Sequence, residues 1–86
     1  MKVMLSEVED EGLISLMGKT VTIFCMNYIY TGQLVGVNDT CIKLDGAKIV
    51  YETGDLKTKT WQNAQELPQG SWYVQTSSIE SFGLLK

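Results

Sequence analysis

The fold is decided by one stretch of the chain, residues 20–37, with the sequence TVTIFCMNYIYTGQLVGV. In its first part apolar residues alternate with threonines, which is the period of a half-buried strand. Its second part is rich in β-branched and aromatic residues but contains Gly32 and Gly36. Glycine inside a strand marks a bulge or a sharp bend. The stretch therefore predicts strands at about 19–26 and 28–37, the second bent over a core.

The next segment, 40–52, is also strand-like, but its pattern shifts in the middle. Apolar residues occupy even positions before Asp45 and Gly46 and odd positions after them. A two-residue hairpin at this dipeptide explains the shift, and so does one long strand with a bulge there. The sequence leaves both structures open.

A short helix is predicted ahead of the strands, at about 7–17. Ser6 and Glu9 have the spacing of a capping box, and further acids lie in the first turn, where the helix dipole favours negative charge. Gly18 stands where helices end in the left-handed conformation.

The rest of the chain contains a long polar connection and two short strands. The connection covers about 53–70, with a helical turn predicted near 61–67. The strands are predicted at about 71–76 and 79–84. The predicted core comprises Val21, Ile23, Tyr30, Leu34, Val74 and Ile79.

With 86 residues, the chain has room for one core, so we expect a single domain over 1–86. One helix followed by five short, bent strands predicts a mostly β fold. The expected architecture is a small SH3-like five-stranded bent barrel with a short N-terminal α-helix.

Composition excludes several function classes. The net charge is −3, and histidine and arginine are both absent. Without histidine there is no Ser-His-Asp or Cys-His arrangement and no ordinary general base near neutral pH, so we do not expect an enzyme. An acidic chain is also poorly suited to long-range electrostatic binding of DNA, and no DNA partner is expected.

The two cysteines, Cys25 and Cys41, lie in predicted strands. They are too few for a disulfide framework or a zinc site, so buried reduced thiols are expected, with no metal and no cofactor. The sequence contains neither a signal-peptide core nor an apolar run long enough for a membrane span. We therefore expect a cytoplasmic protein with no membrane partner.

Three segments resemble sequence motifs of one family. Residues 16–23, LMGKTVTI, are similar to the opening hydrophobic-x-G-K-x-V-x-V of the first Sm motif, and residues 30–34, YTGQL, match its aromatic-x-G-x-L. Residues 73–79, YVQTSSI, have the spacing of the second motif, aromatic-I-R-G-x-x-I. The chain thus resembles a divergent member of the Sm-like (LSm/Hfq) superfamily.

This resemblance implies a homo-oligomeric ring of five to seven copies, in which the fourth strand of one subunit pairs with the fifth strand of the next. The strand pattern agrees, because the last two predicted strands carry a single charge, Glu80, and lack the usual charged protection of sheet edges. The candidate interface residues are Trp72, Tyr73, Val74, Ile79 and Phe82.

The resemblance also implies single-stranded RNA as a ligand, although the site departs from the family pattern. No stacking aromatic residue or reading asparagine follows Asp39, and Gln75 with Thr76 replaces the Arg-Gly pair. The candidate RNA-binding residues are Asn38, Asp39, Gln75 and Ser77, whose amides, hydroxyl and carboxylate could contact a base. The alternatives are that Asn38 and Asp39 serve only as turn residues, and that the ring is a structural assembly, as in a phage, without RNA binding.

One further group is Lys57, Lys59 and Trp61, which resembles a basic patch with an aromatic platform. Lysines in a polar loop more often serve solubility, and that is the interpretation favoured here. Trp61 is expected at the surface or an interface, and Trp72 is expected to be packed.

Overall fold

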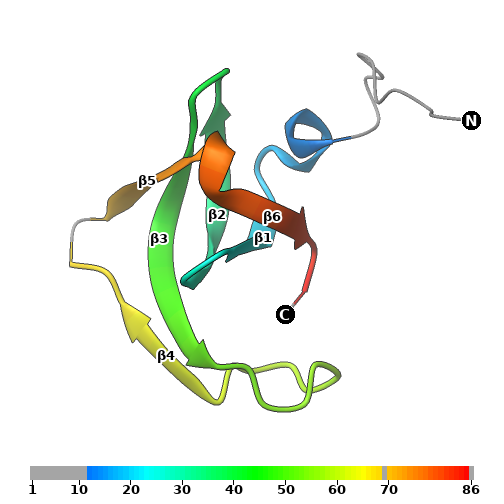
Figure 1. The fold of residues 1–86 in the computed structure, drawn as a ribbon. Coiled ribbons are helices and arrows are strands. Elements are labelled where there is room, and N and C mark those ends of the chain that lie inside the picture. Colours follow the sequence, from blue (N-terminus) through cyan, green and yellow to red (C-terminus); the bar gives the residue numbers. More distant parts are fainter. Residues whose placement is uncertain (1–11, 69, 86) are drawn as a thin grey trace, which may run out of the picture.

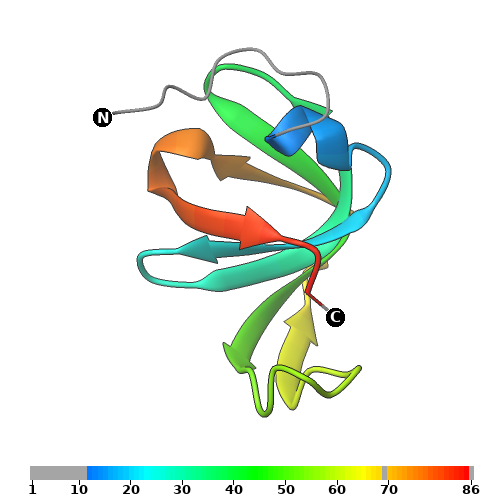
Figure 2. The same cartoon turned by 90° about the vertical axis from the view of Figure 1, so that its right-hand side faces the viewer.

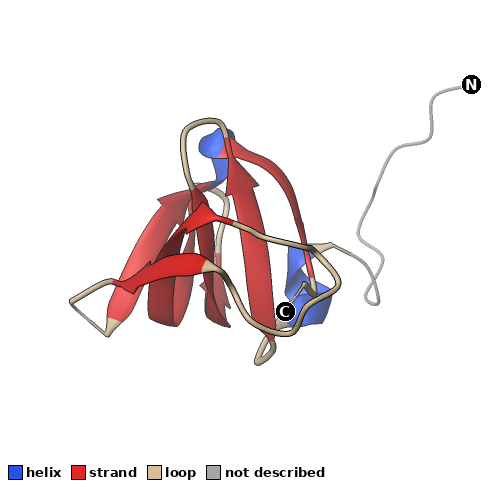
Figure 3. Ribbon diagram, turned by 90° about the horizontal axis from the view of Figure 1, so that it is seen from below, coloured by secondary structure: helices blue, strands red, loops and turns tan. Residues whose placement is uncertain are grey.

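The structure is a computed structural model that describes residues 12–68 and 70–85. Its described part is mostly β, as predicted, with two short 3₁₀ turns and no α-helix (Figures 1 and 3). In chain order, the elements are η1 (Leu13–Leu16), β1 (Thr20–Cys25), β2 (Ile29–Val37), β3 (Cys41–Glu52), β4 (Asn63–Glu66), β5 (Ser71–Gln75), η2 (Thr76–Ser78) and β6 (Ile79–Gly83).

All six strands belong to one antiparallel sheet with the order β4-β3-β2-β1-β6, and β5 pairs with β3 as well. The sheet is strongly curved, and the three-residue η2 carries the chain from β5 back across the molecule to β6 (Figure 2). Consecutive strands up to β4 are neighbours, so most of the sheet is built from local hairpins.

The long strand β3 contains a bulge that decides between the two structures left open by the sequence. Gln33 of β2 pairs with Asp45 and Thr31 pairs with Lys48, so two residues of β3 oppose one residue of β2. Gly46 occupies the bulge with a φ of 60°, a conformation that favours glycine. The Asp-Gly dipeptide is therefore a bulge within a continuous strand, and no hairpin forms there.

The bulge also divides the far edge of β3 between two partners. The first half of the strand, 41–45, pairs with β5, and the second half, 48–52, pairs with β4. As a result the hairpin of β3 and β4 extends beyond the rest of the sheet (Figure 1).

A single apolar cluster fills the concave side of the sheet. Its buried members are Val21, Ile23, Leu34, Ile42, Leu44, Ala47 and Val74. Of the predicted core residues, Tyr30 and Ile79 are only half-buried and pack against this cluster. Burial of these apolar side chains is the main favourable contribution to folding, at roughly 25 cal/mol per Å² of apolar surface.

Two predictions differ from the structure. Part of the helix expected at 7–17 lies outside the described residues, and the described part contains only the 3₁₀ turn Leu13–Leu16, followed by Gly18 with a φ of 83°. The helical turn expected near 61–67 is wrong, because Asn63–Glu66 forms β4. This segment pairs with backbone groups of β3 that β5 leaves free.

The observed bounds of the other five strands differ from the predicted ones by at most one residue. Within the described ranges, no helix has the length and hydropathy required to cross a bilayer.

Candidate functional site

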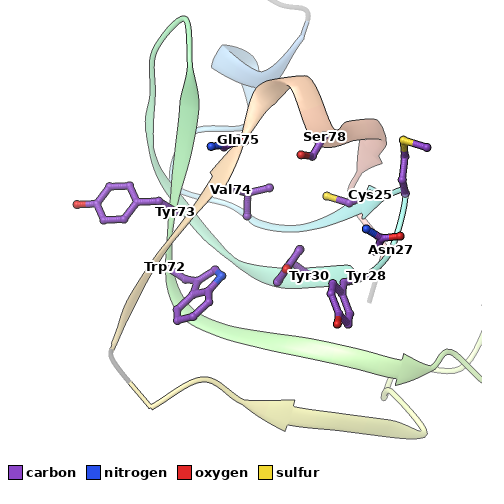
Figure 4. Close-up of a pocket in the computed structure, with 10 residues that line it drawn as sticks. Cys25, Asn27, Tyr28, Tyr30, Trp72, Tyr73, Val74, Gln75 and Ser78 are labelled. Carbon is purple, nitrogen blue, oxygen red and sulfur yellow. The ribbon is translucent and has the colours of Figure 1, made fainter.

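A cleft of about 400 Å³ lies on the curved sheet between the β1–β2 turn and β5. We call it the aromatic cleft (Figure 4). None of the residues that line it is charged. Those used below are Cys25, Tyr28, Tyr30, Trp72, Tyr73, Val74 and Gln75.

The rings in this cleft are held in a fixed arrangement. Tyr28 and Tyr30 lie with their ring centroids 6.3 Å apart and tilted by 58°, a favourable geometry for aromatic pairs. Burial raises the pKa of Tyr30, and a hydrogen bond with the indole of Trp72 opposes this shift only in part. Tyr30 of β2 therefore stays neutral near neutral pH, and it lines the same cleft as Trp72 of β5.

Cys25 lies at the same cleft and is a poor nucleophile. Burial raises the pKa of its thiol, and the negative charge of Glu80 raises it further. Because the thiolate is the reactive species, this thiol is largely unreactive near neutral pH. The described residues also contain no group of three His, Cys, Asp or Glu side chains that could hold a metal ion.

The turn between β2 and β3 contains two of the predicted RNA-binding residues. The Oδ1 atom of Asn38 accepts hydrogen bonds from the backbone N–H of Thr40 at 2.8 Å, the hydroxyl of Thr40 at 3.0 Å and the N–H of Cys41 at 2.9 Å. These bonds form an Asx-type turn, which is the turn interpretation weighed above. The side-chain oxygen of Asn38 is thus engaged within its own loop.

This turn lies against the end of β5. The hydroxyl of Thr76 donates to the backbone oxygen of Asp39 at 3.0 Å, and the N–H of Thr76 donates to Thr40 at 2.9 Å. The structure therefore brings the two predicted loops together. Asn38, Asp39, Gln75 and Ser77 are all exposed.

The predicted interface residues divide into two groups. Val74 is buried in the core, and Trp72 and Ile79 are half-buried against it. Tyr73 and Phe82 are exposed by 62% and 39%, respectively. Only these last two offer large apolar side chains to a neighbouring molecule.

A second hollowed surface surrounds Trp61, and we call it the Trp61 groove. It consists of two hollows of about 220 Å³ and 380 Å³, both lined by Trp61 and Lys48, and the larger is also lined by Lys59 and Asn63. The sequence pattern indicated Lys59 and Trp61 but missed Lys48. No local signal could have found it, because Lys48 reaches this surface only through the pairing of β3 with β4.

Comparison with known proteins gives no independent assignment. No protein-family model, no curated protein and no solved structure matches this chain.

Proposed function

We propose that this chain is a subunit of an Sm-like homo-oligomeric ring, assembled by pairing β5 of one copy with β6 of the next. The observation that carries the proposal is that, among the described strands, β5 and β6 each have a free edge, as β4 also does. In the described ranges β5 pairs only with β3, and β6 pairs only with β1. Both strands have five residues, so their backbone groups match in number.

The backbone of β5 supports this pairing in detail. The N–H of Thr76 and the C=O of Gly70 both bond toward β3. Because N–H groups alternate in direction along an antiparallel strand, those of Tyr73 and Gln75 point toward the free edge. They are therefore available to the carbonyl groups of a second strand.

The strand order supports the resemblance to Sm-like proteins. The strands follow the spatial order β6-β1-β2-β3-β5, and a 3₁₀ turn connects β5 to β6 in the sequence. Within the part of the chain that the structure describes, the outer edges of β5 and β6 are unpaired, and these are the two strands that pair between subunits in that family. A head-to-tail contact of this kind closes into a ring when the rotation between subunits sums to a full turn, and the resemblance favours five to seven copies.

Size-exclusion chromatography with light scattering tests the proposal. The expected mass is five to seven times the 9.6 kDa of one chain. A Tyr73→Pro variant removes an edge N–H without removing a bond to β3, and it is expected to yield folded monomer. Tyr73→Thr, which keeps the N–H, is the matched control and is expected to assemble. A monomeric wild type, or a Tyr73→Pro variant with unchanged mass, would contradict the proposal.

Binding of single-stranded RNA at the loop residues is the second candidate function. It is supported by the bonds that hold the 38–41 turn against Thr76, because they bring Asn38, Asp39, Gln75 and Ser77 to neighbouring loops. Fluorescence anisotropy with oligo(U) and oligo(A) tests it. Gln75→Ala is expected to weaken binding while the oligomer mass stays the same, and an absence of binding at micromolar protein would end this candidate.

A further inference from the structure

The Trp61 groove is not used by the proposed assembly. Its larger hollow is lined by Lys48 of β3 and residues 59–64, and its smaller hollow also by residues of β1 and β2. Neither hollow shares a lining residue with the aromatic cleft beside β5. A ligand there would leave the free edges of β5 and β6 untouched.

The groove combines an aromatic ring, positive charges and neutral polar groups. Trp61 is half-buried and lines both hollows. Lys48 also lines both hollows, and Lys59 lines the larger one. The remaining lining is rich in hydroxyl and amide groups, including those of Gln33 and Asn63. An indole face stacks with planar rings, and an ammonium group binds a phosphate as a point charge.

Two acidic groups lie near the lysines of the groove. Asp45 is the single acid among the lining residues, and its Oδ1 accepts a hydrogen bond from the Ser71 hydroxyl at 2.8 Å. Glu66 lies opposite Lys48 in the β3–β4 register but does not line either hollow. An anion in the groove would therefore meet two cations and would be repelled by the carboxylates of Asp45 and Glu66.

We propose that the Trp61 groove binds a nucleoside phosphate, with the base against the indole of Trp61 and the phosphate near Lys48 and Lys59. The larger hollow, at about 380 Å³, has the size of a small-molecule site. With two lysines in the lining of an acidic protein, the groove suits one nucleotide unit and has no long basic track for a strand.

The experiment follows the indole N–H signal of Trp61 in two-dimensional NMR spectra of the full chain. The protein has two tryptophans, so a Trp72→Phe variant assigns the two signals. AMP, adenosine and ribose 5-phosphate are titrated separately to millimolar concentration. AMP is expected to shift the Trp61 signal and to bind more tightly than either half of the molecule, because only AMP supplies both the base and the phosphate.

Substitutions then distinguish binding at a specific site from non-specific attraction to positive charge. Lys48→Gln and Lys59→Gln are each expected to weaken AMP binding by about two- to fivefold. The matched control is Lys57→Gln, which removes the same charge from the same loop outside the groove lining and is expected to have less than about a twofold effect. Trp61→Ala is expected to cost about fivefold or more, measured by calorimetry. Since Lys59 is exposed, its variant keeps the test valid if Trp61→Ala fails to fold.

One variant is expected to gain affinity, an effect that misfolding does not imitate. Glu66→Gln removes the acid opposite Lys48 and is expected to strengthen AMP binding by up to about fivefold.

An adenylate hexamer identifies the source of the ligand. Affinity equal to that of AMP points to a free nucleotide, and tighter binding with the same loss in Lys59→Gln points to a nucleotide within a strand.

The proposal is overturned if AMP leaves the Trp61 signal unchanged, if Lys57→Gln weakens binding as much as Lys59→Gln, or if a neutral disaccharide binds equally well. Light scattering reports the assembly separately, so the two proposals can fail independently.

Discussion

Replacement of Gly32 by alanine is expected to destabilise the fold at the β3 bulge. A Cβ atom at this position would lie 3.0 Å from the backbone oxygen of Asp45, 3.2 Å from the Cα of Ala47 and 3.2 Å from the Cβ of Leu44. Two of these atoms belong to the backbone of β3. The clash can therefore be relieved only by moving the strand, since no rotation of a flexible side chain removes it.

The size of the effect follows from the cost of overpacking. Forcing one extra carbon into a packed site typically costs about 1–3 kcal/mol. At roughly 0.05–0.15 kcal/mol per residue, a chain of 86 residues has about 4–13 kcal/mol of total stability. Each kcal/mol lowers the midpoint of thermal unfolding by about 4–8 °C in a domain of this size, so the expected decrease is about 4–24 °C.

Gly36→Ala is the matched control for this measurement. Its Cβ would meet only the Cβ of Lys43 at 3.4 Å, an ordinary contact. Because alanine restricts the unfolded chain more than glycine does, this variant is expected to be neutral or slightly stabilised. The two variants are compared by thermal unfolding, followed by far-UV circular dichroism. Protein concentrations are kept equal, because association also shifts the midpoint. A Gly32→Ala protein that unfolds within about 1 °C of the wild type would refute the reasoning.

Three further predictions concern the turn and the thiol. Asn38→Ala is expected to lower the free energy of unfolding, measured with urea, by about 1 kcal/mol, because Oδ1 accepts hydrogen bonds from three donors. Asn38→Asp keeps an acceptor and should stay near the wild type. Equal losses of stability in both variants would contradict this role. In a Cys41→Ser protein, the alkylation rate of Cys25 is expected to rise with pH, with a midpoint above pH 9.0. Glu80→Gln should lower that midpoint, because it removes a nearby negative charge. A midpoint below pH 9.0 would show that burial does not control the pKa of the thiol. Burial raises the pKa of both Cys25 and Tyr30 in the folded protein, so the unfolded chain releases these protons at a lower pH than the folded chain does. The free energy of unfolding is therefore expected to fall as the pH rises above about 9. An unchanged urea midpoint between pH 8 and pH 10 would contradict this expectation.

The strands with clear patterns could be predicted from the sequence, and the strand without one could not. Alternating apolar residues over 20–25 and β-branched residues over 29–37 are local signals, and they lie in β1 and β2. The segment 63–66, NAQE, has neither alternation nor strong β propensity. It becomes β4 because the second half of β3 offers unpaired backbone groups, which is a property of the assembled sheet.

The same division applies to the candidate sites. The turn role of Asn38 is encoded locally, since an Asx turn needs only the next few residues. The aromatic cleft brings Tyr30 and Trp72 together from distant parts of the sequence, and the Trp61 groove does the same for Trp61 and Lys48. Such neighbours depend on the path of the strands, so no spacing pattern along the chain indicates them.

The divided edge of β3 gives this chain a natural place for an engineered graft. The buried side chains of β3 extend only as far as Val50, and beyond it the tip of the β3–β4 hairpin is an exposed turn closed by the bond from the N–H of Thr58 to the oxygen of Asp55. Doubling the length of such a loop adds only about 0.6 kcal/mol of closure entropy. An epitope or affinity tag inserted between Asp55 and Thr58 should therefore leave the scaffold intact.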